Sequence, residues 1–209
     1  MSEPDWLTLA RELQAIAQTG LAFTRDVYDR ERYERLRGLA SGLTGRLSEW
    51  PAALIEDLFV GESGYATPKV DVRGAAFDGE GRILLVREIA DEGRWTLPGG
   101  WADVNLSPAE NVVKEMREES GYEVAARKLA AVWDRTRQNH PPKVFSCCKV
   151  FFICDLVGGA PATSIETSEI GWFREDALPE DLSLARVLPG QLRRMFEHRR
   201  DPALPTDFD

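Results

Sequence analysis

The chain has 209 residues, of which 43% are hydrophobic and 29% charged, and its formal net charge at pH 7 is -9. This composition is ordinary for a globular protein, and the length suits one domain with an appendage or two small domains. The negative charge argues against nonspecific binding to nucleic acid or anionic membranes. No apolar stretch approaches the roughly 20 residues of a membrane span, and the N-terminus has no secretory signal, so we expect a cytoplasmic protein without a membrane partner.

The first third of the chain has a helical pattern. Apolar residues recur every three or four positions over residues 6–17, which predicts an amphipathic helix that Gly20 is expected to end. A second helix is predicted from about Asp26, and a third, short one after Pro51. The turn-rich segment GESGYATP that follows is typical of a linker.

The rest of the chain is rich in strand-like runs. KVDVRGAAF and RILLVRE are separated by DGEG, which predicts a hairpin-like connection, and further runs lie at EVAARKLAAVWDR, KVFSCCKVFFICDLV and EIGWF. Two helical stretches interrupt them without regular alternation, so the pattern predicts an α+β sandwich or an α/β/α arrangement. The two parts are expected to form separate domains, at residues 1–64 and 65–209.

A turn followed by a capped helix stands out in residues 97–122, LPGGWADVNLSPAENVVKEMREESGY. The proline and two glycines at its start bend the backbone and let it come close to a site. Ser107 is expected to cap the helix, Pro108 suits its first position, and Glu110 completes a capping box. Gly121 is expected to close the helix.

Three glutamates, Glu115, Glu118 and Glu119, share one face of this predicted helix. Their like charges repel, and a hard divalent cation such as Mg²⁺ would offset the repulsion while bridging to substrate phosphates. The alternative interpretation is a solvated acidic surface, which accounts for most glutamate clusters. The cap, the glycine turn and Gly121 favour a site, which indicates a metal-dependent enzyme that acts on a phosphate ester or anhydride.

The same segment resembles the Nudix box, G-x5-E-x7-R-E-U-x-E-E-x-G-U, in which U is a bulky apolar residue. The match starts at Gly100 and includes the three glutamates. Leu106 stands where the first glutamate is usual and Lys114 where the arginine is, and in the family these two residues commonly interact. Lys114 is expected to reach Glu118 or Glu110, each four residues away on the helix.

The N-terminal stretch LQAIAQTGLAFTRDVYDRERYERLR looks like the helical domain of a bacterial two-domain Nudix subfamily that acts on nucleoside diphosphates linked to a second group. The resemblance implies the Nudix α/β/α sandwich, an α+β fold, preceded by a small helical domain that builds a homodimer. It also implies hydrolysis of the pyrophosphate bond, with CDP-choline, which gives CMP and phosphocholine, as the leading substrate.

Two alternatives to that substrate and that class of protein stay open. ADP-ribose or an RNA end would change the substrate and keep the enzyme, and an RNA end would be the one nucleic acid partner. A Nudix-fold sensor that binds a nucleotide without turnover is a different class of protein, and Leu106 and Lys114 are the departures from the box that favour it.

The resemblance implies that Glu115, Glu118 and Glu119 hold one or more Mg²⁺ or Mn²⁺ ions, with a backbone carbonyl of Gly99 or Gly100 in the ligand shell. Such ions lower the pKa of bound water and clamp phosphate oxygens. Water would then attack one phosphorus of the bridge and release a nucleoside monophosphate and a phosphorylated second group.

A general base is also needed. Some Nudix enzymes take it from the box, which points to Glu118 or Glu119, and others take it from a later loop. Glu166 and Glu169 are the candidates on that loop, and Glu166 is preferred because its position is less constrained by a strand. Plain surface acidity is the alternative interpretation of both residues.

Basic residues are the candidates for substrate binding. Arg73, Arg87 and Lys149 lie in strand-like runs, where a buried charge requires a partner. Arg135 borders the loop TRQNHPPK and is expected to meet phosphates. Of these, Arg73, Arg87 and Arg135 are the predicted substrate ligands, and an ion pair within the protein is the alternative for each.

Overall fold

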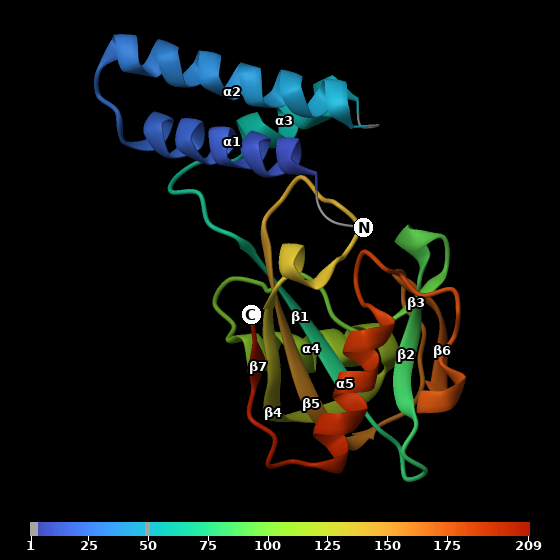
Figure 1. Ribbon diagram of the computed structural model, residues 1–209. Helices are drawn as coiled ribbons and strands as arrows, with labels where there is room; N and C mark the ends of the chain where they lie inside the picture. The colour runs from blue at the N-terminus through green and yellow to red at the C-terminus, as the bar shows by residue number, and fades with distance from the viewer. Residues whose placement is uncertain (1–3, 49–50) are drawn as a thin grey trace. The chain divides into compact units, whose positions relative to one another are not determined.

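The computed structural model describes residues 4–48 and 51–209, and the chain forms two compact units (Figure 1). The first unit is the chain up to Pro68 together with Pro141–Ser146, and the second is Lys69–His140 with Cys147–Asp209. A short segment from the second half of the sequence therefore belongs to the first unit, which the predicted division at residue 64 does not include.

The described residues of the first unit form three helices: α1 (Asp5–Phe23), α2 (Val27–Leu47) and α3 (Ala52–Gly61). Asp26 caps α2, because its side chain accepts hydrogen bonds from the amides of Tyr28 and Asp29 at 2.8 and 2.9 Å. Among the described residues, no helix is both long and apolar enough to cross a membrane.

The prediction that Gly20 ends the first helix is wrong, because α1 continues to Phe23. A Cβ atom at Gly20 would lie 2.4 Å from the ring of Tyr33. This glycine therefore makes room for an aromatic ring of α2 at the α1–α2 contact. A glycine inside a helix costs about 1 kcal/mol of helix propensity, which the packing of the two helices offsets.

The first unit has a core of its own, to which the 141–146 segment contributes. Four residues are buried together in it: Ala40, Ile55, Phe59 and Val144. The guanidinium of Arg11 also donates a hydrogen bond to the carbonyl of Lys143 at 2.9 Å. The helical unit is thus completed by residues from the second half of the sequence.

Two β-sheets form the second unit. The first has the order β1-β5-β4-β7, with β1 at Lys69–Ala76, β4 at Tyr122–Asp134, β5 at Cys147–Gly159 and β7 at Asp207–Phe208. In this sheet β1 runs parallel to β5, and β4 runs antiparallel to β5. The second sheet is antiparallel, with the order β3-β2-β6, and comprises β2 at Ile83–Glu88, β3 at Arg94–Thr96 and β6 at Thr167–Phe173.

Strands β1 and β2 are joined by a tight turn but belong to different sheets. The amide of Asp78 donates to the carbonyl of Arg82 at 3.0 Å, and Phe77 and Ile83 form an isolated antiparallel bridge. The predicted hairpin-like connection is confirmed at this turn, but it does not extend into a two-stranded ladder. Both strands instead pair with strands from later in the chain: β1 lies at the edge of its sheet beside β5, and β2 lies between β3 and β6.

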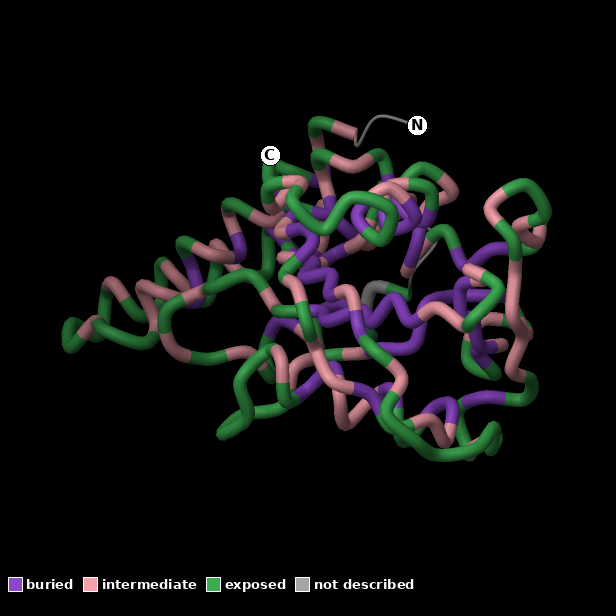
Figure 2. Tube along the Cα trace, turned by 90° about the horizontal axis from the view of Figure 1, so that it is seen from below, coloured by how far each residue is buried: buried purple, intermediate pink, exposed green. Residues whose placement is uncertain are grey.

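Helices α4 (Pro108–Ser120) and α5 (Pro189–Arg200) cover opposite faces of the strands. Successive side chains of a strand point to opposite faces, so one set packs with α4 and the other with α5. The α4 side includes Val72, Ala76, Leu84, Val112 and Met116, and the α5 side includes Ala75, Ile83, Leu85, Leu192 and Met195. Buried residues form long runs along these strands (Figure 2). The predicted α+β sandwich is confirmed.

Three short 3-10 helices complete the connections, at Ile89–Asp91, Arg135–Gln138 and Glu175–Ala177. Just after the second of them, His140 is buried and bonded at both ring nitrogens. Its Nδ1 lies 2.7 Å from the carbonyl of Leu184, and its Nε2 lies 3.1 Å from the amide nitrogen of Gln191. The side-chain oxygen of Gln191 accepts from the amide of Leu188 at 3.0 Å, which fixes its orientation. This arrangement suits a neutral imidazole that donates from Nδ1 and accepts at Nε2.

The buried imidazole makes the stability of the second unit depend on pH. Burial lowers the pKa of His140 to about 4, although the Leu184 carbonyl opposes this effect. An unfolded histidine titrates near 6.5, so the unfolded chain takes up a proton that the folded chain excludes. The stabilisation is complete above about pH 6.5 and is lost as the pH falls towards 4, by about 3 kcal/mol in total.

We therefore expect His140→Gln to lose less unfolding free energy than the wild type between pH 7.5 and pH 4.5. Urea unfolding of both chains, followed by tryptophan fluorescence, measures this difference. Other groups contribute equally to both chains, so an identical loss in the two would contradict the assignment to His140.

Candidate active site

The helix α4 begins and ends as its sequence predicts. The hydroxyl of Ser107 accepts from the amide of Glu110 at 3.2 Å, and the Glu110 carboxylate accepts from the amide of Ser107 at 2.8 Å. Gly121 closes the helix with φ 73°, in the left-handed region. The capping box and the closing glycine are therefore confirmed, and they fix which residues α4 presents to the strands.

A glycine in β1 brings α4 close to that strand. A Cβ atom at Gly74 would lie 2.6 Å from the sulfur of Met116, so only glycine allows this approach. Met116 is fully buried there, and the glutamates on either side of it are turned to a common edge of the helix. Glu119 has 3% of its surface exposed, whereas the side chains of Glu115 and Glu118 are 13% and 53% exposed.

The glycine turn, which we define as Leu97–Gly100, holds Glu119. The amide of Gly99 donates to its carboxylate at 2.8 Å. Gly99 has φ 140°, and a Cβ atom there would lie 2.0 Å from the carbonyl oxygen of Val72, so no other residue fits. Burial raises the pKa of Glu119 to about 7, while the charge of Arg73 and the Gly99 amide oppose that effect.

Glu115 lies against the other glycine of the turn. A Cβ atom at Gly100 would be 3.2 Å from its carboxylate oxygen. Burial raises the pKa of Glu115, Lys114 opposes this, and the negative charges of Glu118 and Glu166 raise it further. Glu166 is exposed on the loop before β6, and its charge therefore acts on the same carboxylate that the glycine turn contacts.

Lys114 pairs with Glu118, which is one of the two partners predicted for it from the sequence. Its Nζ lies 2.8 Å from Glu118, 3.2 Å from Asp103 and 3.7 Å from Glu115. The hydrogen bond with Glu118 is the largest cause that raises the pKa of Lys114. Glu110, the other predicted partner, is engaged in the capping box. Asp103 was not foreseen, since only the folded loop brings it to the helix.

The carboxylates fit a hard divalent cation in their chemistry. Burial and neighbouring negative charges raise the pKa values of Glu115 and Glu119, and a cation would relieve both effects. In the described part of the chain, however, no group of three His, Cys, Asp or Glu side chains is gathered closely enough to hold an ion. Glu118 is paired with Lys114, so it would have to exchange this lysine for the cation in order to act as a ligand.

The three predicted substrate arginines are not brought together. Arg73 is buried, and its guanidinium donates to Asp71 at 2.7 and 3.0 Å and to the carbonyl of Leu97 at 3.1 Å. Arg135 is buried in the 3-10 helix after β4. Only Arg87 is partly exposed, and it stacks on Trp95 at 5.0 Å from the ring centroid.

The two glutamates predicted as bases differ in their surroundings. Glu169 lies in strand β6 and not on a loop, and its carboxylate is 3.2 Å from Arg87, which also pairs with Asp181 at 2.9 Å. Glu166 is exposed, its backbone carbonyl accepts from the amide of Ile89 at 2.8 Å, and its side chain acts electrostatically on Glu115. The structure therefore connects Glu166, rather than Glu169, to the glutamate face of α4.

A sandwich of this topology, with a glycine turn against a capped helix that carries three glutamates, defines a Nudix-type hydrolase. Comparison with known proteins agrees. Residues 67–194 match the NUDIX domain, and residues 4–59 match the UDP-X-like, N-terminal oligomerisation domain. The chain belongs to the Nudix family and is a Nudix pyrophosphohydrolase, which confirms the resemblance of its sequence.

Several relatives span most or all of the chain. The Bacillus subtilis protein YjhB, provisionally named an ADP-ribose pyrophosphatase, is 50% identical over 98% of this chain and 97% of its own. The crystal structure of an ADP-ribose pyrophosphatase from Streptococcus suis has 41% identity and a TM-score of 0.61, over 68% of this chain and all of its own. The crystal structure of a UDP-X diphosphatase has 33% identity and a TM-score of 0.62, over the full length of both.

Proposed function

We propose that this enzyme hydrolyses the pyrophosphate bridge of a nucleoside diphosphate linked to a second group, with Mg²⁺ or Mn²⁺ held by Glu115, Glu118 and Glu119. The observation that carries the proposal is the contact between the glycine turn and the glutamate face. There, Gly99 binds Glu119 and Gly100 lies against Glu115. A bound ion would supply charge neutralisation and an activated water.

The chain's own residues have separable roles in this proposal. Glu119 is the buried ligand, fixed by the Gly99 amide, while Glu118 is exposed enough to turn from Lys114 to the ion. Lys114 would then be released towards the phosphates, where its positive charge is useful. Glu166 is the proposed base, since it is exposed and acts on Glu115. Its carboxylate would accept the proton of the attacking water.

Substrate recognition is assigned to Arg87, because Arg73 and Arg135 are buried, and the carbonyl of Gly99 is assigned to the metal. Arg87 is the most exposed of the predicted arginines, and its guanidinium is held 5.0 Å from the ring centroid of the buried Trp95, so it presents a supported positive charge. Gly99 is preferred to Gly100 as a backbone metal ligand because the carbonyl of Gly100 already accepts from the amide of Val72 at 2.8 Å. Arg73 is not assigned to the substrate, because its side-chain donors bind Asp71 and the carbonyl of Leu97.

The choice of substrate is among three nucleoside diphosphate derivatives. ADP-ribose is supported by the names of the Bacillus and Streptococcus relatives, and a uridine derivative by the full-length UDP-X diphosphatase. CDP-choline is the candidate from the resemblance of the N-terminal stretch. We place ADP-ribose first, because the proteins that support it have 50% and 41% identity.

The test is the release of nucleoside monophosphate from ADP-ribose, a UDP-sugar and CDP-choline, with purified full-length protein. Turnover is expected with Mg²⁺, and it should disappear after chelation and return when Mg²⁺ is restored. Preference for CDP-choline would keep the mechanism and change the substrate. If the protein bound these nucleotides but hydrolysed none of them, a nucleotide sensor would be favoured instead. In that case Lys114 would stay paired with Glu118.

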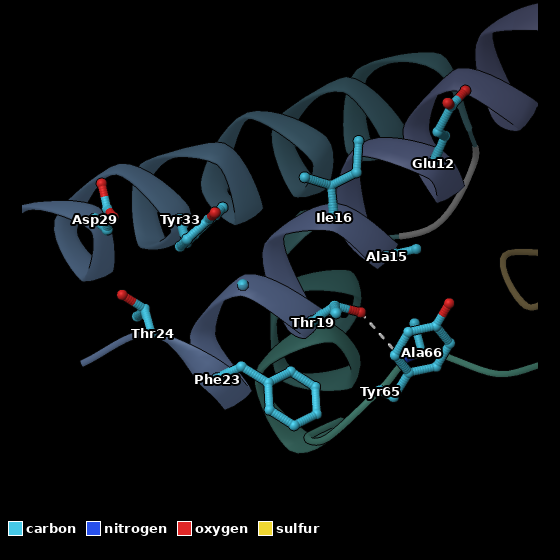
Figure 3. A pocket seen from close by; sticks show the side chains of 11 residues that line it. Glu12, Ala15, Ile16, Thr19, Phe23, Thr24, Asp29, Tyr33, Tyr65 and Ala66 are labelled. Carbon is cyan, nitrogen blue, oxygen red and sulfur yellow. Dashed lines mark hydrogen bonds between the residues drawn. The ribbon is translucent and has the colours of Figure 1, made fainter. Parts of the chain in front are cut away.

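We also propose that the helical domain builds a homodimer. A groove lies on it between α1, α2 and residues 65–66 (Figure 3), where the amide of Ala66 donates to the hydroxyl of Thr19 at 3.3 Å. Phe23 and Tyr65 line this groove with 68% and 70% of their surfaces exposed. Large apolar surfaces left exposed are typical of interfaces, and the matching family model describes an oligomerisation domain. Sedimentation equilibrium is expected to give twice the mass of one chain.

A further inference from the structure

Three charged side chains are buried together beneath the glycine turn. Asp71 and Arg73 lie two residues apart on the same face of β1, and Lys149 stands opposite Asp71 on β5. The Nζ of Lys149 lies 2.6 Å from one oxygen of Asp71, and Arg73 binds the same carboxylate through two nitrogens. These residues, which we call the buried ion triad, have 6%, 3% and 1% of their surfaces exposed, in chain order.

The triad is connected to the glycine turn by a side chain as well as by backbone. The third donor of Arg73 reaches the carbonyl of Leu97, the first residue of the turn, at 3.1 Å. The amides of Val72 and Gly74, which flank Arg73 on β1, donate to the carbonyls of Gly100 and Pro98 at 2.8 and 3.0 Å. Residues on both sides of Arg73, and Arg73 itself, therefore all hold the turn.

Burying three charges is a poor way to stabilise a fold. The loss of hydration of such groups commonly exceeds the gain from their attraction, and apolar residues often replace them without loss of stability. Burial lowers the pKa of Lys149 to about 8, against the opposing effect of Asp71. The triad also carries one net positive charge, and the Arg73 part of it acts on Glu119.

We propose that the buried ion triad positions the metal site, by holding the glycine turn so that its Gly99 amide stays on Glu119. The argument follows the contacts outward: Lys149 fixes Asp71, Asp71 fixes both branches of Arg73, and Arg73 fixes the start of the turn. Its members are positioning residues and touch neither substrate nor metal. This inference rests on the proposed function, since it concerns the same glutamate ligand.

The principal variant is Lys149→Met, which keeps an unbranched side chain and removes the charge. Binding of Mn²⁺ to the full chain is measured by electron paramagnetic resonance of the free ion. We expect the dissociation constant to rise about tenfold, together with the metal concentration that gives half-maximal turnover. The KM for the nucleotide at saturating metal should stay within about twofold, because the triad does not contact the substrate.

Two further measurements separate positioning from a general loss of stability. Met195→Ala removes a fully buried side chain of α5, so it lowers stability while every member of the triad and its hydrogen bonds are kept, and it should leave Mn²⁺ binding unchanged. Hydrogen exchange at the Gly99 amide should accelerate in Lys149→Met under conditions in which the variant is folded. If Lys149→Met does not fold, Asp71→Asn, which keeps the shape of the side chain, takes its place.

The outcomes separate the positioning role of the triad from the proposed function. The positioning role would be overturned if the folded triad variants bound Mn²⁺ as tightly as the wild type and their Gly99 amide stayed protected from exchange. The proposed function would then remain intact. Equal weakening in Met195→Ala would also overturn it, since the effect would then follow stability alone. A wild-type chain that binds no Mn²⁺, and behaves like Glu119→Gln in this assay, would overturn the proposed function and the inference with it.

Discussion

Replacing Glu119 by glutamine is expected to lower kcat about 10³-fold, within the range found when a group that acts in the chemistry is removed. Glutamine has nearly the same size, and its oxygen can still accept from the Gly99 amide, which now lies 2.8 Å from the carboxylate. What the variant loses is the negative charge, which binds a hard divalent cation more strongly than a neutral amide oxygen does. The rate of nucleoside monophosphate release at saturating Mg²⁺ measures this loss.

The stability of Glu119→Gln, unlike its kcat, is not expected to fall. Burial raises the pKa of Glu119 to about 7, so at neutral pH the protein bears the cost of a partly ionised buried carboxyl group. Removing that charge is expected to leave the melting temperature equal or higher. Glu180→Gln, at an exposed glutamate outside the site, is the control and should keep both properties. A Glu119→Gln chain with more than a tenth of wild-type kcat would contradict the assignment of Glu119 as a ligand.

The substitution Gly99→Ala is expected to destabilise the second unit by about 3 kcal/mol, from backbone strain and from overpacking together. Gly99 has φ 140°, and the added methyl group would lie 2.0 Å from the carbonyl of Val72 and 2.9 Å from the Cα of Arg73. Both neighbours are backbone atoms of a buried strand, so neither can move aside cheaply. The turn must shift instead, which also takes the amide away from Glu119.

Urea unfolding and Mn²⁺ binding together test this prediction. Gly79→Ala is the matched control, because a Cβ atom at Gly79 meets nothing within 4 Å, and its effect should stay within about 0.5 kcal/mol. A Gly99→Ala chain that unfolds like this control, with unchanged Mn²⁺ binding, would show that the close approach of turn and strand is not required.

The parts of the site that follow from local sequence could be predicted. The start of α4, its closing glycine and the shared face of its glutamates depend on residues within one or two turns of each other, and the capping box at Ser107 and Glu110 formed as expected. The mixture of strand-like runs with two helical stretches likewise predicted the α+β sandwich. Such features need no knowledge of distant partners.

The parts that depend on strand pairing could not be predicted. Arg73 and Lys149 were recognised as charges in strand-like runs, but only the register of β1 and β5 places Lys149 opposite Asp71. The residues lie 78 positions apart in the sequence. For the same reason the position of Val144 in the core of the helical unit was not foreseen. A buried charge signals that it needs a partner, but not which residue supplies it.

Glycine was the residue whose role was hardest to assign from sequence. Gly20 was expected to end a helix and instead makes room for Tyr33 inside it. Gly99 was expected to let backbone approach the site, and its amide does bind Glu119. In both cases the need for glycine comes from what lies opposite the missing Cβ atom, which depends on tertiary packing.

The central claim is that Glu115, Glu118 and Glu119 together hold the ion, and crystals of the full chain soaked with Mn²⁺ test it most directly. Anomalous scattering locates manganese without ambiguity. The predicted result is a peak bonded to Glu119 and Glu115, with the Glu118 carboxylate turned from Lys114 to the ion. A peak elsewhere, or none at all, with Lys114 still 2.8 Å from Glu118 as in the present structure, would contradict it.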